Sequence, residues 1–121
     1  MSRPERDLRI DYIELPATDL PRAKAFYHNA FGWEFTDYGD EYSAFNDGAL
    51  DGGIAKMDPD KVIGYRGALV VLYAVDLEAA RATVLELGGR IETDIFSFPG
   101  GRRFHFFDTE GNVLAIWSDP E

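Results

Sequence analysis

A strand followed by a capped helix occurs twice in this sequence, and this repeated plan constrains the fold more than any other feature. The first copy covers residues 10–33 and the second covers residues 68–89. At an offset of fifty-seven residues, Asp19 of the first copy matches Asp76 of the second. A repeat of this length indicates two similar supersecondary units that share one core.

The first copy opens with an alternating segment, Ile10–Leu15. Alternation is typical of a strand that presents different residues on its two faces. We expect Ile13 and Leu15 to face a helix, and Tyr12 and Glu14 to lie on the opposite face.

The helix of the first copy has a start signal and a stop signal. Pro16 cannot donate to a sheet ladder, so we expect the strand to end there. Asp19 is placed as an N-cap, Pro21 is tolerated in the first turn, and the helix is predicted to start near Leu20 and to stop at Gly32. Apolar residues recur at helical spacing and would cover the strand: Ala23, Phe26, Tyr27, Ala30 and Phe31.

The second copy repeats this order and predicts the same architecture. Ala68–Val75 reads as a strand, and a helix is predicted from the stripe Leu77, Ala80, Val84 and Leu87. The remaining strands are predicted at Trp33–Tyr38, Tyr42–Phe45, Leu50–Met57, Arg90–Phe98, Arg103–Phe107 and Val113–Ser118. The predicted fold class is α+β: two βαβββ modules that form a concave, U-shaped mixed sheet with helices on its outer face. The half-modules are expected at about residues 8–57 and 67–119 of a single domain 1–121, joined by a linker at 58–64.

Composition excludes several classes of partner. The formal charge of −10 repels phosphate backbones and anionic lipid, so neither nucleic acid nor a membrane surface is an expected partner. A cationic ligand and simple solubility are both compatible with this charge. The chain has no cysteine, its first residues lack the apolar core of a signal peptide, and its longest apolar run is too short to span a bilayer. We therefore expect a cytoplasmic protein.

Three sequence elements resemble the vicinal oxygen chelate superfamily, which includes glyoxalase I, bleomycin-resistance proteins and extradiol dioxygenases. They are the segment A-K-A-F-Y-x-x-A-F-G-W-E-F at Ala23–Phe35, the helix end Leu87–Gly89, and D-x-x-G-N at Asp108–Asn112. The resemblance covers nearly the whole chain. It implies a cavity between two βαβββ modules, small-molecule ligands and a homodimer, and an open sheet also gains burial by pairing.

Metal-using members of that family hold the ion with His or Glu on the first and last strands of each half. Carried onto this chain, those positions fall on Tyr12, on Val70 or Leu69, on Gly53 or a neighbour, and on Ala115. Apolar side chains and glycine offer no lone pairs to a divalent ion. Asp51 and Glu14 lie near two of the positions, yet we expect no metal and no other cofactor.

Two residues are candidates for proton transfer. His105 is central in a predicted strand, on one face with Arg103, and would titrate near neutral pH; a hydrogen-bonded structural histidine is the other interpretation. Glu14 is placed to point into the concave side, where burial would suit it to proton abstraction, or to remain a solvated carboxylate at the mouth. His28 lies off the apolar stripe of its helix and is assigned to the surface.

The predicted ligand-binding residues are mostly aromatic: Tyr12, Trp33, Tyr42, Arg103 and Trp117. The aromatic residues would line the cavity, although aromatics at strand spacing also build cores. Arg103 follows a Gly-Gly turn and would clamp an anionic group or remain a solvated strand-end charge.

These observations leave three functional hypotheses. The first is a metal-free module that binds a small, partly aromatic molecule between the halves, as the resistance proteins of the family do. The second is a glyoxalase-like lyase or isomerase that transfers a proton through Glu14 or His105 while Tyr12 polarises an oxygen. The third is a structural or regulatory dimer without a pocket.

Overall fold

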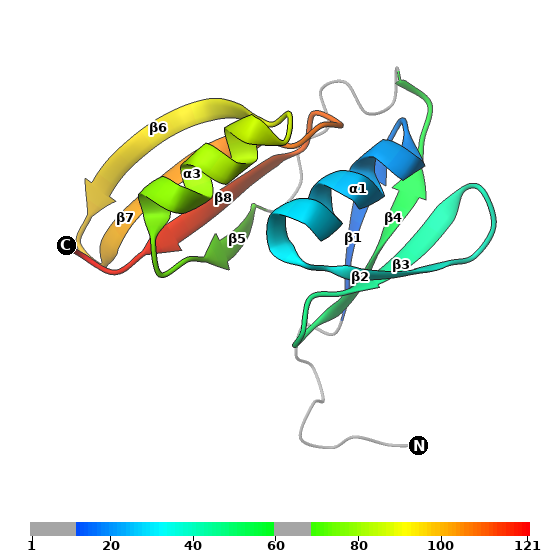
Figure 1. Ribbon diagram of the computed structural model, residues 1–121, viewed down its shortest axis with the longest axis horizontal. Helices are drawn as coiled ribbons and strands as arrows, with labels where there is room; N and C mark the ends of the chain where they lie inside the picture. Colours follow the sequence, from blue (N-terminus) through cyan, green and yellow to red (C-terminus); the bar gives the residue numbers. More distant parts are fainter. Residues whose placement is uncertain (1–11, 60–68) are drawn as a thin grey trace.

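The protein folds into two βαβββ modules, each with a four-stranded mixed sheet and one helix (Figure 1). The computed structural model describes residues 12–59 and 69–121. The first module contains β1 (Tyr12–Ala17), α1 (Leu20–Phe31), β2 (Glu34–Asp37), β3 (Tyr42–Asn46) and β4 (Asp51–Lys56). The second contains β5 (Val70–Tyr73), α3 (Leu77–Glu86), β6 (Arg90–Phe98), β7 (Gly101–Phe107) and β8 (Val113–Ser118).

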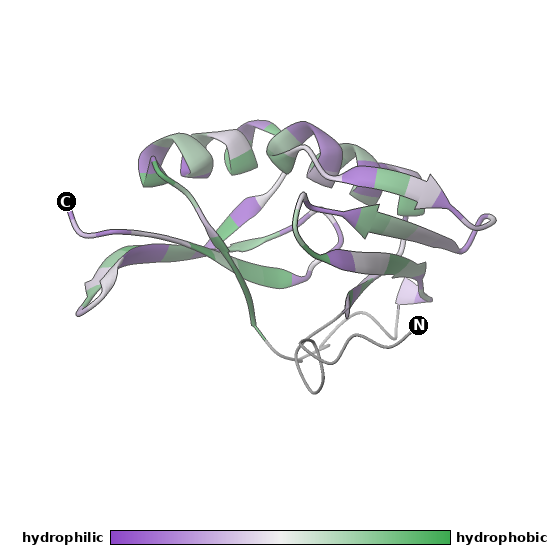
Figure 2. Cartoon of the chain, turned by 90° about the horizontal axis from the view of Figure 1, so that it is seen from below, coloured by the Kyte–Doolittle hydropathy of each residue, from purple (hydrophilic) through white to green (hydrophobic). Residues whose placement is uncertain are grey.

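The two sheets have the same topology. Their strand orders are β1-β4-β3-β2 and β5-β8-β7-β6. β1 pairs in parallel with β4, and β5 pairs in parallel with β8. The α+β prediction with two repeated modules is therefore confirmed. Both helices lie along the same side of the molecule (Figure 2). Within residues 12–59 and 69–121, no helix is both long and apolar enough to cross a bilayer.

The predicted helix signals act as expected. The Asp19 side chain accepts a hydrogen bond from the backbone N–H of Arg22 at 3.0 Å, and Asp76 accepts one from Ala79 at 3.0 Å. Gly32 ends α1 with a φ of 78°, in the left-handed region that glycine adopts without a steric penalty.

The prediction that Pro16 ends the first strand is wrong, because β1 continues to Ala17 and pairs with β4 through both residues. The carbonyl oxygen of Pro16 accepts a hydrogen bond from the Asn112 side chain, which comes from the other module. In a strand the N and C=O of one residue point to the same side, so the missing N–H also points away from β4. Proline is tolerated at such an edge position because it removes no ladder bond.

Some residues of the predicted strands and of the predicted linker lie outside the part of the chain that the structure describes. They include Ile10, Ala68 and most of the linker 58–64. β5 is shorter than the predicted Ala68–Val75, and Val71 pairs with Ala115 in the register between β5 and β8. From the sequence, one of the family's metal positions is predicted at Val70 or Leu69. Val70 packs against the core, so the residue of this strand that faces away from the helices is Val71.

Helix α1 contributes aromatic side chains to a core that both modules share. Phe26 and Phe31 of α1 lie with their ring centroids 6.4 and 6.3 Å from that of Phe106 in β7. Phe104 and Phe106 are completely buried, while His105 between them lies on the opposite face. The alternation predicted for this strand is thus confirmed.

The loop between β7 and β8 joins the second module to the start of α1. Buried Asp108 accepts a hydrogen bond from the Tyr27 hydroxyl at 2.6 Å. Oε1 of Glu110 accepts hydrogen bonds from the backbone N–H groups of Thr18 and Asp19 at 2.9 and 2.8 Å. We call this set of contacts the module junction, and it fixes the relative position of the two halves.

Candidate functional site

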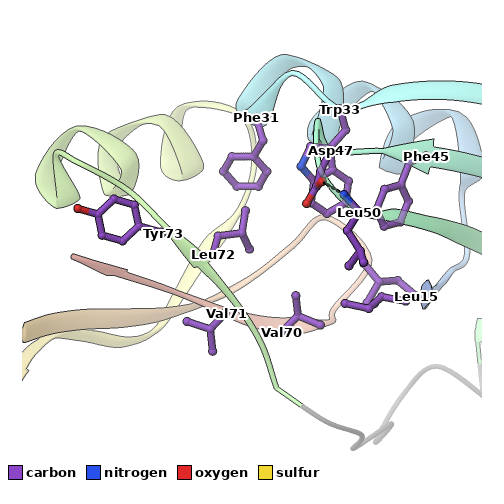
Figure 3. A pocket seen from close by; sticks show the side chains of 11 residues that line it. Leu15, Phe31, Trp33, Phe45, Asp47, Leu50, Val70, Val71, Leu72 and Tyr73 are labelled. Carbon is purple, nitrogen blue, oxygen red and sulfur yellow. Dashed lines mark hydrogen bonds between the residues drawn. The ribbon is translucent and has the colours of Figure 1, made fainter. Parts of the chain in front are cut away.

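An apolar groove lies between β1 of the first module and β5 of the second (Figure 3). Its volume is about 460 Å³, within the range of pockets that take small organic molecules. Most of its lining residues are apolar, and the polar side-chain groups are those of Asp47, the Trp33 indole and the Tyr73 hydroxyl: Ile13, Leu15, Phe31, Trp33, Phe45, Asp47, Leu50, Val70, Val71, Leu72 and Tyr73. Both modules contribute to this groove, and Trp33 is the one predicted ligand-binding residue in its lining.

Trp33 lies in the wall of this groove and not beside the other predicted aromatic ligands. Only 5% of it is exposed, and its ring stacks between those of Tyr27 and Phe45, at centroid distances of 4.4 and 4.3 Å. Trp33 therefore belongs mainly to the core, with one edge available to a groove ligand.

The face of the first sheet that points away from α1 carries a hydrogen-bonded chain of three side chains. The hydroxyls of Tyr12 and Tyr42 lie 2.6 Å apart, and Tyr42 donates to Oε2 of Glu14 at 2.8 Å. We call these residues the tyrosine relay. Burial, followed by the hydrogen bonds to Tyr12 and Glu14, raises the pKa of Tyr42, so its hydroxyl stays protonated at neutral pH.

Gly53 makes the relay possible. It lies between Glu14 on β1 and Ala44 on β3 in the sheet register, and a Cβ atom at this position would collide with the Tyr42 hydroxyl. From the sequence, one of the family's metal positions is predicted at Gly53 or a neighbour. The packing reason for the glycine appears only when the cross-strand neighbours are known.

The second sheet carries a cationic cluster on its corresponding face. The Arg103 guanidinium carbon lies 5.3 Å from the ring centroid of Phe96 and 5.5 Å from that of Phe98. Nε of Arg103 and Nε2 of His105 are buried and have no hydrogen-bond partner in the described residues. Nδ1 of His105 lies 3.8 Å from a Glu92 oxygen. Nε of Arg103 offers a hydrogen-bond donor between aromatic walls, as an anion would require, and Nε2 of His105 donates or accepts according to its tautomer.

Trp117 adjoins this cationic cluster. It pairs with Arg103 across β7 and β8, and its ring lies 5.0 Å from that of Tyr73 in an edge-to-face arrangement. Sequence reasoning did not single out Tyr73, Phe96 or Phe98. The bulged register between β6 and β7, which places Phe96 opposite Arg103, has no clear signal in the sequence.

The predicted site residues thus form two groups on separate sheets. Tyr12, Glu14 and Tyr42 are joined on the first sheet, and Arg103, His105 and Trp117 are neighbours on the second. His28 is exposed on α1, as expected for a surface residue, and its Nδ1 lies 3.0 Å from the carbonyl oxygen of Trp33.

The family's metal does not fit the residues found at the matching strand positions. On the faces away from the helices these are Tyr12, Gly53, Val71 and Ala115. In the described part of the chain, no three His, Cys, Asp or Glu side chains converge as a metal site requires. The tyrosine relay occupies the space in front of Gly53, where a ligating side chain would project.

A family model supports the resemblance over most of the chain. The model described as "Glyoxalase/Bleomycin resistance protein/Dioxygenase superfamily" matches residues 9–116. A curated protein from Didymella fabae, named "Glyoxylase-like domain-containing protein", is 34% identical over 123 residues, which cover 93% of this chain and 94% of that protein.

Solved structures share the fold at low sequence identity. A mutant of the genomically encoded fosfomycin resistance protein of Listeria monocytogenes, complexed with Mn(II) and 1S,2S-dihydroxypropylphosphonic acid, matches with a TM-score of 0.78 and 19% identity, covering 93% of this chain and 90% of that one. A glyoxalase-related enzyme from Fulvimarina pelagi matches with a TM-score of 0.74 and 15% identity, covering 93% and 88%. At these identities the likeness concerns the fold.

Proposed function

The chain belongs to the glyoxalase/bleomycin resistance protein/dioxygenase superfamily, and on that premise we propose that it binds a small, partly aromatic molecule in the groove between its modules, without the family's metal. The observation that carries this proposal is the groove of about 460 Å³ with its largely apolar lining from both halves. Burial of apolar ligand surface against such side chains provides the binding free energy, and Asp47 and Tyr73 supply polar contacts.

A thermal-shift screen with uncharged aromatic compounds tests the groove, and 1-naphthol serves as the first probe. A ligand at 100 times its dissociation constant stabilises the folded state by about 2.7 kcal/mol, which is visible in a domain of this size. Leu50→Gln places a polar group in the lining and should reduce the shift. Leu85→Gln is the matched control, because Leu85 is 43% exposed on α3 and lies outside the lining. No shift with any compound, or equal shifts in both variants, would overturn the proposal.

The proposed absence of a metal has its own test. Elemental analysis of protein purified without a histidine tag should find no metal in stoichiometric amount, because the matching strand positions carry no cluster of donors. Stoichiometric zinc, manganese or iron that resists dialysis would contradict the assignment.

A second candidate function is a lyase or isomerase reaction by proton transfer, favoured by Nε2 of His105, which has no partner within residues 12–59 and 69–121, and by the Glu14 carboxylate. An enzyme of this kind would exchange carbon-bound hydrogen next to a carbonyl for solvent deuterium. NMR of hydroxyketones incubated with the protein in D₂O measures this exchange. Exchange that is lost in Glu14→Gln or His105→Ala supports the reaction, and no exchange above the buffer rate excludes it for those compounds.

We also propose a homodimer that pairs through β5. This strand is an edge of its sheet among the described residues, and three large side chains on it or just after it are exposed: Val71 by 43%, Tyr73 by 51% and Val75 by 88%. Unpaired edges with apolar side chains are sites of association. Light scattering should give twice the chain mass, and Val71→Lys should shift the protein toward monomer. A wild-type monomer at micromolar concentration would refute the dimer, whereas a dimer without ligand binding would favour a structural or regulatory role.

A further inference from the structure

The tyrosine relay faces a second hollow, separate from the groove between the modules. We propose that this hollow, in front of the first sheet, binds a protonated organic amine. The ligand class differs from the uncharged molecule proposed for the groove, and Phe45 is the one lining residue that the hollow and the groove share.

The lining of the hollow combines aromatic rings with carboxylates. Its volume is about 440 Å³, and Tyr12, Tyr38 and Tyr42 contribute to its wall together with Glu34 and Asp51. No Lys or Arg is among the described residues that line it. The faces of aromatic rings attract cations, and nearby carboxylates add a favourable field. An ammonium group on an apolar stem matches both features.

The direction of the hydrogen bonds in the relay selects a ligand that donates. Tyr42 donates the single proton of its hydroxyl to the Glu14 carboxylate. The bond between the two tyrosine hydroxyls must then be donated by Tyr12. Tyr12 has therefore used its proton, and its oxygen presents only lone pairs to a ligand.

This polarity argues against the role that the family resemblance suggested for Tyr12. A residue that polarises a substrate oxygen must donate a hydrogen bond to it, and Tyr12 is left as an acceptor. An N–H group of an alkylammonium ion satisfies the lone pairs of the Tyr12 oxygen. The Tyr12 oxygen thus favours a hydrogen-bond donor, and the carboxylates of Glu34 and Asp51 favour one that carries positive charge.

A metal ion is a poorer occupant than an amine. Asp51 already accepts a hydrogen bond from the Asn46 side chain at 2.8 Å, and Glu14 accepts one from Tyr42. The described residues hold no group of three carboxylates or imidazoles that converge. An ammonium ion needs no such coordination shell, because its charge can lie against ring faces.

Calorimetric titration with benzylamine and with benzyl alcohol tests the proposal at low ionic strength and pH 7. The two probes have nearly the same shape and both can donate a hydrogen bond, so they differ chiefly in charge. We expect benzylamine to bind at least about fivefold more tightly, which corresponds to a cation–π interaction of about 1 kcal/mol. Equal affinities, or binding of neither probe, would overturn the proposal.

Two variants locate the binding. Tyr12→Leu removes an aromatic wall and Glu14→Gln removes the charge that orients the relay, so each should abolish the preference for benzylamine. The matched control for Glu14→Gln is Glu78→Gln, since Glu78 is an exposed carboxylate of the second module that lines neither the hollow nor the groove. A preference that survives in both relay variants, or that is lost equally in Glu78→Gln, would contradict the assignment.

The groove variant keeps the two proposals distinguishable. Leu50→Gln should weaken the binding of 1-naphthol and leave the preference for benzylamine unchanged, because Leu50 lines the groove and not the hollow. Loss of that preference in Leu50→Gln would show that benzylamine occupies the groove, which would refute the separate cation site.

Discussion

Glu110→Gln at the module junction gives the sharpest test of what holds the two halves together. The Glu110 side chain has no exposed surface. Its Oε1 accepts from the backbone N–H groups of Thr18 and Asp19, and its Oε2 accepts from Nε of Arg22 at 2.7 Å. The Thr109 hydroxyl also donates to Oε2 at 3.0 Å. Every one of these partners is a donor, so a carboxylate satisfies them all.

Glutamine supplies one acceptor oxygen and an NH₂ group that faces donors. Hydrogen bonds to a charged group contribute about 1.5–3 kcal/mol each, roughly twice those of neutral pairs. Breaking one partner of a fully buried ion pair costs about 3–5 kcal/mol. Because half of the Arg22 side chain is exposed and can be solvated, we expect the lower end, about 3 kcal/mol.

The pH dependence of this cost follows from the protonation of Glu110. Burial raises its pKa, but hydrogen bonds from Arg22, from the Asp19 backbone and from Thr109 outweigh burial and lower the pKa below its ordinary value. A carboxylate with a lowered folded-state pKa stabilises the protein above its unfolded-state pKa, and this contribution is lost as the pH falls through the folded-state value. The difference between wild type and Glu110→Gln should therefore be largest at pH 7 and shrink on acidification below about pH 4.

Urea denaturation followed by tryptophan fluorescence measures both effects. The matched control is Glu78→Gln, because Glu78 also pairs with an arginine, Arg102, at 2.6 Å but is mostly exposed. We expect the control to change the midpoint little. A Glu110→Gln loss no larger than that of Glu78→Gln, or a loss that grows toward acid pH, would refute the reasoning.

Three further substitutions test local features by urea denaturation. Asp19→Ala removes the N-cap of α1 and should cost about 1 kcal/mol, and an unchanged midpoint would mean that the cap contributes nothing. Gly53→Ala should displace the Tyr42 hydroxyl and destabilise the protein by about 1–3 kcal/mol through overpacking. The pKa of Tyr42, followed by ultraviolet titration, should fall. An unchanged titration would contradict the contact between residue 53 and the hydroxyl. Tyr27→Phe should cost about 1–3 kcal/mol because buried Asp108 loses a donor, and a neutral effect would show that water replaces the hydroxyl.

Local signals in the sequence predicted the elements of this fold well. Asp19, Asp76 and Gly32 are read by rules that involve only the neighbouring residues, and all three act as those rules state. The alternation of buried and exposed residues around His105 was also predicted from neighbouring residues alone. The prediction for Pro16 was wrong because the effect of a proline depends on whether another strand lies on the side of its backbone nitrogen. Local sequence does not give that information.

The candidate site was less predictable because its contacts join distant residues. Tyr12 and Tyr42 are thirty residues apart, and their bond depends on Gly53 lying beside both. The bond between Glu110 and Thr18 spans ninety-two residues. The D-x-x-G-N motif predicted a turn and resembled a family element, but the donors that its carboxylates bind became visible only in three dimensions.

The two hairpin turns that precede β4 and β8 show how the two halves differ. In both turns an aspartate accepts backbone N–H groups of its own loop: Asp47 from Ala49 and Leu50, and Asp108 from Glu110 and Asn112. Among the described residues the Asp47 side chain accepts from its own loop alone, whereas the other oxygen of Asp108 also accepts from Tyr27. A chimera that carries the first half twice would retain two sheets and two capped helices but would lose the module junction. One half therefore cannot replace the other.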